Sequence, residues 1–399
     1  MDLRSDYPYW LLEHGLMKSY PSLNENVSTD VAIIGAGVTG SLVAYHLNKA
    51  GFDVTIVDKR HVGTGSTAAS TSLLQYEIDT SLVKLKEKVG ESAAIESYLV
   101  CRQSIYDLEE IIHHLKDETS FKKRNSFQFA STQKHVPALE AEYNARKAAG
   151  IKVEWLSDID IQNKFGFRKG GGILSRDAAE IDAYALTHAL LNSCIKKSVR
   201  IYDHTKVEEI HHVKRGVELI TDSQKKIRAK KLVIACGYEA QQYIRQKVQT
   251  LHSTYAIISE PFNNSKFWHR NSLIWETAVP YLYLRTTATN RIVIGGKDEY
   301  FRGSKKRDAL IPQKTKQLER SFASLFPDIP FKTDFQWAGT FASTKDGLPY
   351  IGSVKQHPHT YFALGFGGNG ITFSVIAAQM IRDFICRGKR GKNVFGFER

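Results

Sequence analysis

Three glycines between two apolar runs constrain this chain more than any other feature. Residues 31–58 read VAIIGAGVTGSLVAYHLNKAGFDVTIVD, with the spacing G-x-G-x-x-G at Gly35, Gly37 and Gly40. The first glycine permits a tight turn after a strand, the second lets a pyrophosphate approach the backbone, and the third lets a helix pack close to the sheet. The stretch therefore predicts a strand, a helix and a second strand, with a dinucleotide at the helix N-terminus.

The second apolar run ends in Asp58, which indicates how the nucleotide is held. An acid at this place accepts hydrogen bonds from two ribose hydroxyls and disfavours a 2′-phosphate. The glycine spacing alone does not distinguish FAD from NAD. The following stretch, VGTGSTAASTSLLQYEID at 62–79, is rich in small and hydroxyl side chains that can wrap a pyrophosphate and pass under a ring system. A nicotinamide enzyme more usually continues directly into another helix and strand, so the stretch favours FAD.

Patterns along the rest of the chain predict an α/β fold of two domains that cross the chain several times. Helical periodicity is present at 80–118, 133–149, 181–194, 314–326 and 371–385, and strand patterns are present at 124–131, near 199–202, 206–212, 216–221 and 228–235, within 251–300, and at 361–366.

We expect a discontinuous Rossmann-type FAD-binding domain interleaved with an α+β substrate-binding domain that is built on a mainly antiparallel sheet. The expected bounds are 27–80, 150–240 and 338–399 for the first, 81–149 and 241–337 for the second, and 1–26 for an N-terminal extension.

Composition bounds the partners and the compartment. The net charge of +13 admits an anionic substrate, a membrane surface or nucleic acid, but the basic residues form short clusters without a nucleic-acid motif, so a solvated basic surface is preferred and no nucleic acid is expected. The cysteines at 101, 194, 236 and 386 lack metal or redox spacing, which indicates a reduced, cytoplasmic protein without a metal. The sequence shows no signal peptide, and no apolar run reaches the roughly 18 residues that a membrane span needs.

Four stretches, taken together, resemble the D-amino-acid oxidase-like (DAO) family of FAD-dependent oxidoreductases, the group with glycine oxidase and sarcosine oxidase. They are the glycine unit through Asp58, GSTAASTSLL at 65–74, KLVIACG at 231–237, and the pair TKDGLPYIG at 344–352 and ALGFGGNGITF at 363–373. They follow the family's order and span nearly the whole chain.

The resemblance implies that FAD is held without a covalent bond by several groups of residues. The group at the pyrophosphate is Gly35, Ala36, Gly37, Thr39 and Gly40; Asp58 and Lys59 lie by the adenosine ribose; Ser66, Thr67, Thr71, Ser72 and Leu73 line the flavin and ribityl chain; Val207 touches adenine; Gly237 lies near the dinucleotide; and Gly368, Asn369, Gly370, Ile371 and Thr372 bring a helix N-terminus to the pyrimidine edge of the flavin.

The implied reaction is oxidation of a C–N bond in an amine or amino acid. A neutral amine binds over the flavin, its α-hydrogen leaves as hydride, and the product imine hydrolyses, while oxygen or another acceptor takes the electrons. This chemistry requires no dedicated acid–base pair, so the sequence assigns no catalytic residue.

The sequence departs from the family around the substrate. An ungapped alignment places Phe341 where glycine oxidase-like members carry a carboxylate-binding arginine, and Val293 where sarcosine oxidase-like members carry a lysine that promotes reaction with oxygen. No cysteine lies where those members attach the flavin. Candidates for the substrate pocket are Tyr255, Tyr281, Tyr283, Arg285 and Phe341; the aromatic residues could form a cage for a cationic amine or simply pack a sheet.

Two other functions stay open at this point. The chain could be an FAD-dependent oxidoreductase of a non-amine substrate such as a hydroxy acid, because fold does not settle function. It could also be a flavin-binding or electron-transfer subunit without turnover, because the carboxylate-binding arginine is missing.

Overall fold

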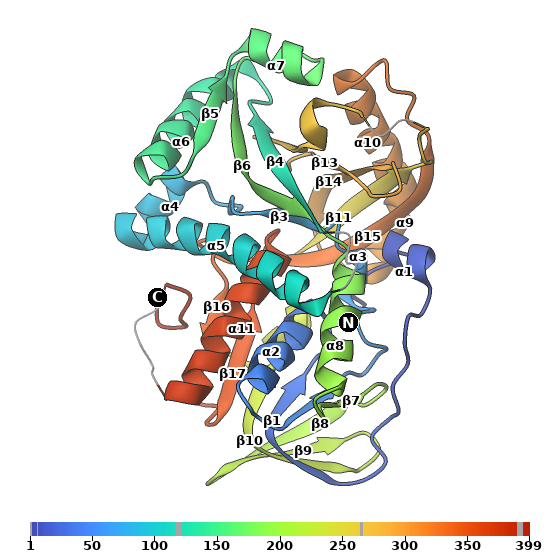
Figure 1. Cartoon of the computed structure of the whole chain (residues 1–399), viewed down its shortest axis with the longest axis vertical. Coiled ribbons are helices and arrows are strands. Elements are labelled where there is room, and N and C mark those ends of the chain that lie inside the picture. The colour runs from blue at the N-terminus through green and yellow to red at the C-terminus, as the bar shows by residue number, and fades with distance from the viewer. Residues whose placement is uncertain (1, 6, 117–120, 264–265, 389–393) are drawn as a thin grey trace.

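Two large sheets, one above the other in Figure 1, organise the chain. The structure is a computed structural model and describes residues 2–5, 7–116, 121–263, 266–388 and 394–399. Segments from both ends and from the middle of the sequence meet in each half of the molecule. The α/β fold that the sequence predicts is confirmed, and so is the crossing of the chain between two halves.

The lower sheet in Figure 1 is mainly parallel and contains the glycine unit. Its strands are β1 (Val27–Ile34), β2 (Val54–Val57), β7 (Arg200–Tyr202), β8 (Val207–Val213), β9 (Gly216–Thr221), β10 (Lys226–Ile234), β16 (Tyr350–Gly352) and β17 (Thr360–Leu364). Their order is β16-β17-β10-β1-β2-β7, and the hairpin of β8 and β9 joins the sheet at β10. β1 lies parallel to both β10 and β2, as a strand–helix–strand unit requires.

The upper sheet is mainly antiparallel. Its strands are β3 (Leu73–Gln75), β4 (Lys122–Phe129), β5 (Val153–Leu156), β6 (Gly172–Glu180), β11 (Thr250–Ser259), β12 (Leu273–Glu276), β13 (Tyr283–Thr286), β14 (Ile292–Tyr300) and β15 (Thr333–Ser343). Their order is β15-β11-β14-β13-β12-β4-β6-β3, with β5 paired to β6. The pair of β12 and β4 is parallel.

Helices cover both sheets. They are α1 (Tyr9–His14), α2 (Val38–Lys49), α3 (Ser66–Ala69), α4 (Leu82–Val89), α5 (Glu91–Leu115), α6 (Val136–Ala148), α7 (Asp158–Phe165), α8 (Ala183–Ile195), α9 (Ser304–Ala309), α10 (Ile311–Leu325) and α11 (Gly370–Arg387), with 3₁₀ turns η1 (Gln133–His135), η2 (Gly237–Tyr243) and η3 (His269–Asn271). In Figure 1, α2, α8 and α11 lie side by side over the lower sheet, and α5 crosses between the two halves.

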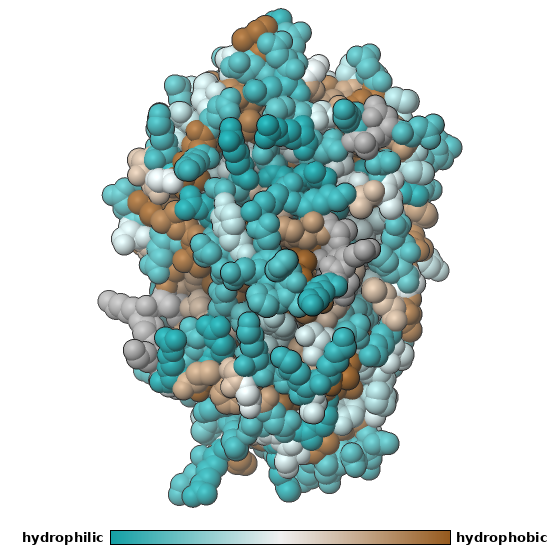
Figure 2. Space-filling view, viewed as in Figure 1, coloured by the Kyte–Doolittle hydropathy of each residue, from teal (hydrophilic) through white to brown (hydrophobic). Residues whose placement is uncertain are grey.

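Three apolar clusters stabilise this arrangement. The largest joins α2, α5, α8 and α11 to one face of the lower sheet, and Val31, Ile33 and Ile56 at its centre are fully buried. A second cluster fills the other face of that sheet. The third lies between the upper sheet and α10 and is rich in phenylalanine. The surface in Figure 2 is correspondingly hydrophilic with scattered apolar patches, and no helix among the described residues is both long and apolar enough to cross a membrane.

The expected domain bounds stay a prediction, but the two sheets divide the chain differently at three strands. β3, β5 and β6 lie in the upper sheet, although 27–80 and 150–240 were expected in the FAD-binding domain. The reason is pairing: β6 runs antiparallel to β3, β4 and β5 at once. The sequence patterns also missed β5, α7 and β6 as elements. Residues 1, 6, 117–120, 264–265 and 389–393 of the expected ranges lie outside the described residues.

The expected N-terminal extension is integrated into the upper sheet. The N–H of Ser5 donates to the carbonyl of Ala338 over 2.9 Å, and the N–H of Thr340 donates to the carbonyl of Leu3 over 2.9 Å. Residues 3–5 therefore lie along the edge of β15.

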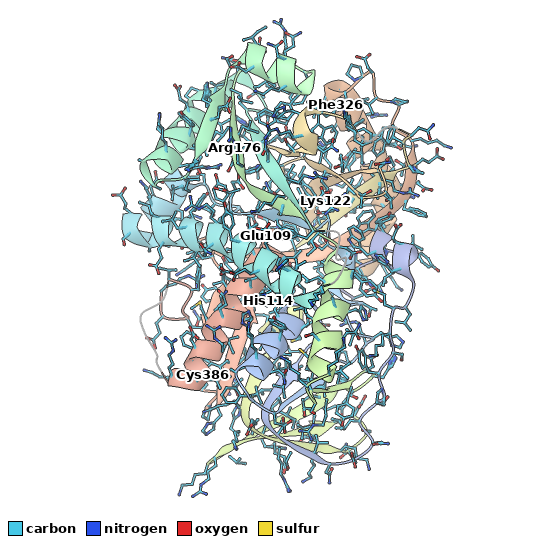
Figure 3. The ribbon with its side chains drawn as sticks, viewed as in Figure 1. Glu109, His114, Lys122, Arg176, Phe326 and Cys386 are labelled. Carbon is cyan, nitrogen blue, oxygen red and sulfur yellow. The ribbon has the colours of Figure 1, made fainter. Side chains whose placement is uncertain are left out.

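All four cysteines have free thiols. Cys101 and Cys194 are buried, Cys236 is half-buried, and Cys386 is exposed near the end of α11 (Figure 3). Among the described residues, no group of three or more histidine, cysteine, aspartate or glutamate side chains could hold a metal ion.

Packing at Gly40 gives a direct test of the glycine unit. A Cβ at position 40 would lie 1.8 Å from the carbonyl oxygen of Gly35. Because backbone cannot move aside as a flexible side chain can, we expect Gly40→Ala to lower the free energy of unfolding by about 3 kcal/mol or more, despite the better helix propensity of alanine. Thermal or urea unfolding measures the change. Gly370→Ala is the control, because a Cβ at position 370, also at the start of a helix, would meet no atom within 4 Å. Equal stability of Gly40→Ala and the wild type would contradict the packing argument.

Candidate functional site

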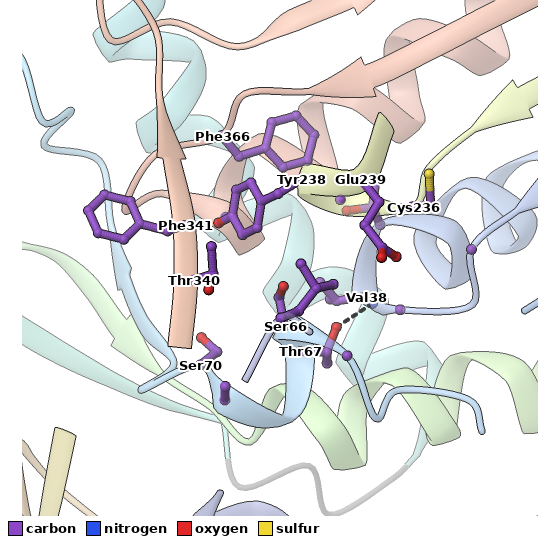
Figure 4. A pocket seen from close by; sticks show the side chains of 18 of the residues that line it. Val38, Ser66, Thr67, Ser70, Cys236, Tyr238, Glu239, Thr340, Phe341 and Phe366 are labelled. Atoms are coloured by element: carbon purple, nitrogen blue, oxygen red, sulfur yellow. Dashed lines mark hydrogen bonds between the residues drawn. The ribbon is translucent and has the colours of Figure 1, made fainter. Parts of the chain in front are cut away.

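A cavity of about 720 Å³ runs from the carboxyl ends of β1 and β2 to the upper sheet. Its walls come from the β1–α2 turn, residues 63–75, the start of β8, η2, β13 to β15 and residues 364–371. Figure 4 shows this cavity from close by, with Thr67 and Val38 on one side and Phe341 and Phe366 on another. Carboxyl ends of strands in a doubly wound sheet are the usual place for a nucleotide.

The β1–α2 turn leaves the first part of this cavity free of side chains. Gly35 has φ +106°, and a Cβ there would lie 2.6 Å from the carbonyl oxygen of Ala235, so only glycine fits. α2 begins directly afterwards with Gly37 as N-cap, a residue without a side chain that could cap the helix. The N–H of Val38 donates to Thr67 Oγ1 over 3.0 Å, the bond drawn in Figure 4. A helix N-terminus facing a cavity attracts an anion such as a pyrophosphate.

Asp58 lies at the end of β2, beside this turn. Its carboxylate accepts from the N–H of Ala36 over 2.8 Å and from the N–H of Arg60 over 2.9 Å. Burial raises the pKa of Asp58, and these two N–H groups oppose that effect. The carboxylate is thus held in place by the backbone while it lines the cavity, which suits an acceptor for ribose hydroxyls.

An ion-pair cluster closes the same end of the cavity. Glu239 in η2 accepts from Lys59 Nζ over 2.8 Å and from Arg60 Nη1 over 3.1 Å. Its side chain is only 6% exposed, and the two cations lower the pKa of its carboxyl against the effect of burial. The cluster fixes the chain after β2 to the chain after β10. Sequence reasoning missed Glu239, although it follows the predicted Gly237 by two residues.

Residues 63–75 form the floor of the cavity. Ser66, Thr67, Thr71, Ser72 and Leu73 all lie in its lining. Ser66 Oγ is buried and has no hydrogen-bond partner among the described residues. Ser72 is 1% exposed and has φ +59°, a left-handed conformation that side-chain-bearing residues rarely adopt. An unpaired hydroxyl and a strained backbone in one loop are typical of a ligand-binding segment.

The N-terminus of α11 reaches the cavity from the other side. Gly368, Gly370 and Ile371 line it, and no side chain caps the helix. The N-cap Asn369 points away, because its Nδ2 donates to the carbonyls of Gln75 and Glu77 over 3.0 and 2.9 Å. A helix N-terminus stabilises negative charge that develops nearby, which suits the edge of a flavin that becomes anionic on reduction.

Most of the predicted cofactor residues thus meet at one cavity. Those that line it are Gly35, Gly37, Thr39, Asp58, Lys59, Ser66, Thr67, Thr71, Ser72, Leu73, Val207, Gly237, Gly368, Gly370 and Ile371. The other four, Ala36, Gly40, Asn369 and Thr372, do not belong to the lining. They act behind it: Gly40 by close packing, and Asn369 and Thr372 by hydrogen bonds that shape the start of α11.

The predicted substrate-pocket residues divide in the same way. Tyr281, Tyr283 and Phe341 line the cavity. Tyr255 does not line the cavity, because its side chain is buried in the apolar cluster between the upper sheet and α10. The centroid of its ring lies 5.2 Å from Lys314 Nζ. Arg285 does not belong to the lining either, so the geometry does not support the hypothesis that it replaces the missing substrate arginine.

Arg285 instead holds the cavity floor. Its guanidinium, 2% exposed, donates through Nη1 to the carbonyls of Thr71, Ser72 and Ile181 over 3.1, 2.8 and 2.9 Å. Two of these carbonyls belong to the strained part of the loop. The cation therefore acts on the loop and not on a ligand.

The two ends of the cavity differ in charge balance. The cationic residues in its lining are Lys59, Arg60 and Lys206, all beside Asp58 or Val207. At that end the acids Asp58, Glu208 and Glu239 accompany the cations, whereas at the other end no cation of the described lining accompanies Asp298. At the upper sheet the lining has Tyr281, Tyr283, Asp298 and Phe341. Sequence reasoning missed Asp298 because GGKDEY at 295–300 gives no signal that separates it from surface acids.

A second acid, Asp79, lies between Tyr281 and Gly368 at this end of the cavity. Tyr281 Oη donates to Asp79 Oδ1 over 3.1 Å, and the N–H of Gly368 donates to Asp79 Oδ2 over 2.8 Å. The rings of Tyr281 and Tyr283 lie 5.8 Å apart, and Trp275 lies 6.0 Å from Tyr281. This end of the cavity combines aromatic surface with carboxylates.

The residues present fit FAD. The glycine turn and the start of α2 accommodate a pyrophosphate, Asp58 accommodates a ribose, and the unpaired Ser66 hydroxyl supplies a donor along the floor. A Cβ at Gly37 would lie only 2.9 Å from Thr67 Oγ1, in the space that the turn leaves open. When bound, FAD supplies the acceptor for two electrons and a hydride.

Removal of the Asp58 carboxylate tests the nucleotide end of the cavity. We expect Asp58→Ala to weaken FAD binding by about 2 kcal/mol, or roughly 30-fold in Kd, because a charged hydrogen-bond acceptor is lost. Quenching of flavin fluorescence on titration of the apoprotein measures Kd. Asp53→Ala is the control, because Asp53 is exposed at the opposite end of β2 and pairs with Arg200. Equal affinities of wild type and Asp58→Ala would exclude the ribose role.

Replacement of Arg285 separates its two possible roles. Because Arg285→Met leaves three buried carbonyls without their donor, we expect a loss of about 3 kcal/mol or more in the free energy of unfolding. Thermal unfolding of the holoprotein measures it, with Arg228→Met, an exposed pair with Glu218, as control. If Arg285 bound the substrate, its replacement would instead raise KM and leave Tm unchanged. That result would contradict the role of Arg285 in holding the loop.

Comparison with known proteins agrees with this site. The model of the DAO family, described as FAD dependent oxidoreductase, matches residues 30–384. The gamma-glutamylputrescine oxidoreductase of Escherichia coli (strain K12) is 22% identical over 380 residues, which cover 92% of this chain and 85% of that protein. A protein of Bacillus subtilis (strain 168), provisionally named as a Rieske 2Fe-2S iron-sulfur protein, is 23% identical over 384 residues. That match covers 94% of this chain and 72% of that protein.

A solved structure shows the same fold. The crystal structure of glycine oxidase from Geobacillus kaustophilus superposes with a TM-score of 0.79 at 20% identity, covering 93% of this chain and 99% of that one. The match of the family model covers nearly the whole chain, including every residue that lines the cavity except Leu3. The protein belongs to the DAO family of FAD-dependent oxidoreductases.

Proposed function

We propose that this enzyme oxidises the C–N bond of an amine that carries no free carboxylate near the reacting carbon. The α-hydrogen of the substrate is transferred as hydride to FAD, and the imine product hydrolyses. FAD is held without a covalent bond, and the residues around the substrate bind it, orient it and exclude water.

The observation that carries this proposal is the charge at the substrate end of the cavity. No arginine or lysine of the described lining lies beside Tyr281, Tyr283 and Phe341, and Asp298 supplies a carboxylate there. A substrate carboxylate in this place would lack the bidentate partner that arginine provides and would face negative charge. An amine, cationic in water, meets aromatic faces and an acid instead.

Two relatives are compatible with this reaction class. The names of the gamma-glutamylputrescine oxidoreductase and of glycine oxidase each refer to a compound with a C–N bond. Phe341, at the position expected to bind a carboxylate, faces His252 with ring centroids 5.2 Å apart. The side chain of Phe341 carries no charge that could bind a carboxylate, which supports a substrate without a carboxylate over glycine itself.

The reduced flavin must pass its electrons either to oxygen or to another electron carrier. Val293 aligns with the lysine that promotes reaction with oxygen in sarcosine oxidase-like proteins. It is 2% exposed on β14 and packs with Trp337 in an apolar cluster. It brings no charge to the flavin. We therefore expect slow reoxidation by oxygen and faster reoxidation by an artificial acceptor such as a phenazine.

Anaerobic reduction of the bound flavin tests the reaction class. We expect alkylamines to bleach the flavin absorbance of the holoprotein, and α-amino acids and α-hydroxy acids of similar size to leave it oxidised. Rapid mixing of each compound class with the holoprotein under nitrogen measures the rate. Bleaching by hydroxy acids alone would replace the proposal with a non-amine reaction, and a flavin that no class reduces would favour a subunit without turnover.

A further inference from the structure

One carboxylate oxygen of an acid in the substrate end of the cavity has no hydrogen-bond partner among the described residues. Asp298 lies in the second half of β14 and lines the cavity. Its Oδ1 is buried and makes no hydrogen bond within the described part of the chain. A buried carboxylate oxygen without a donor costs free energy, which a bound cation or a proton would relieve.

Lys314, the lysine whose charge acts on Asp298, is already paired with another acid. Lys314 Nζ in α10 donates to the carbonyl of Lys297 over 2.9 Å and forms an ion pair with Glu299 at 2.5 Å. Lys297 and Glu299 flank Asp298 in the sequence, so the strand directs the two neighbouring acids to different surroundings. Glu299 is neutralised by Lys314, and Asp298 faces the cavity.

The other groups that interact with the Asp298 carboxyl are neutral or acidic. Tyr283 belongs to β13 and Tyr281 lies just before it, Thr254 belongs to β11, and Asp79 lies in the segment before α4. Burial raises the pKa of Tyr283 to about 12, so its phenol stays protonated at neutral pH. His252, near Asp79, has its pKa lowered by burial, so it is neutral at pH 7 and above. The set carries negative charge without a free cation.

These surroundings prepare Asp298 to exchange a proton near neutral pH. Burial raises its pKa to about 7, and Asp79 acts in the same direction. The Thr254 hydroxyl and the more distant Lys314 oppose this effect. An acid with a pKa near the working pH can both accept and release a proton in a catalytic cycle.

We infer that Asp298 binds the ammonium group of the substrate and removes one of its protons before hydride transfer. This inference rests on the proposed function and names the residue that makes the amine reactive. One N–H bond of the ammonium breaks, its electron pair stays on nitrogen, and an O–H bond forms on Asp298. The neutral amine can then release a hydride from its α-carbon, because the nitrogen lone pair stabilises the cationic imine that remains.

The same geometry defines the substrate class. The rings of Trp275, Tyr281 and Tyr283 form a chain of aromatic contacts beside Asp298, and their faces attract a cation. Asp79 and Asp298 repel an anion. The site therefore takes protonated alkylamines and disfavours a carboxylate at the same position.

A pair of ligands with the same carbon chain and opposite charge tests the cation site without turnover. Butylammonium and butyrate are titrated into the oxidised holoprotein at pH 8, and shifts of the flavin absorbance report binding under nitrogen. We expect the wild type to bind butylammonium at least tenfold more tightly than butyrate. Asp298→Asn should lose that preference, and Glu299→Gln, which removes an equal charge from the other side of β14, should keep it. Preference for butyrate in the wild type would overturn the inference.

Reduction kinetics test the proton transfer. With an alkylamine that bleaches the wild-type flavin, we expect the reduction rate constant to fall as pH decreases below about 7, where Asp298 becomes protonated. Asp298→Asn should reduce flavin about 100-fold more slowly at pH 8 and should lose this step of the pH profile. An unchanged profile in Asp298→Asn would exclude the role as base, because a merely structural residue would alter the rate at all pH values alike.

Thermal unfolding of Asp298→Asn tests whether the variant folds. The direction of its Tm change with pH tests the inference independently of catalysis. The pKa of Asp298 rises from 3.8 to about 7 on folding, so the ionised carboxylate destabilises the fold increasingly between these pH values. Asp298→Asn should therefore raise Tm by an amount that grows from pH 4 to pH 7 and then levels off. A lower Tm at pH 8 would show that the carboxylate has a stabilising partner and would contradict its unpaired state.

The outcomes separate this inference from the proposed function. Flavin that alkylamines bleach equally fast in wild type and Asp298→Asn would support amine oxidation and refute the role of Asp298. Preferential binding of butylammonium without bleaching by any amine would support the cation site and refute the proposed reaction.

Discussion

The absence of side chains in the turn between β1 and α2 is the constraint on which the rest of this structure depends. A Cβ at Gly35 or Gly40 would overlap backbone atoms, so helix α2 can approach β1 only as it does with glycine at both positions. That approach aims the start of α2 at the cavity and places Asp58, at the end of the neighbouring strand, beside it. The position of the nucleotide follows from these backbone contacts and not from any single charged side chain.

The cavity that begins at this turn changes its character along its length. Near Asp58 the charged side chains neutralise each other, since Glu239 is shared by Lys59 and Arg60. Near β13 and β14, by contrast, Asp298 forms no ion pair among the described residues, and its Oδ1 has no hydrogen-bond partner there. The first arrangement suits a permanent cofactor, because a paired cluster holds the walls together whatever the pH. The second suits a substrate that comes and goes with its charge, because the carboxylate gains a partner only while a ligand is bound.

The sequence predicts much of this arrangement because the relevant signals are local. The glycine spacing, the apolar runs of β1 and β2, and the small residues at 65–74 each restrict the backbone within a few residues, and the structure brings these stretches together at one cavity. Arg285 shows where such reasoning ends. Alternation along β13 places it on the same face as Tyr283, but which groups meet that face depends on Thr71, Ser72 and Ile181, more than 100 residues away. The role of Asp298 depends likewise on Lys314 and Glu299, whose pairing no local pattern reveals.

Three unfavourable local features belong to residues that line the cavity. Ser72 has a left-handed backbone, and Ser66 Oγ and Asp298 Oδ1 lack a hydrogen-bond partner among the described residues. Each feature costs folding free energy, so it persists only where surrounding contacts are strong enough to impose it. Arg285 holds Ser72 in its left-handed conformation by donating to the carbonyls of Thr71 and Ser72. For the two unpaired oxygens the protein itself offers no compensation, and the groups that would relieve them are a bound cofactor at Ser66 and a cationic substrate at Asp298.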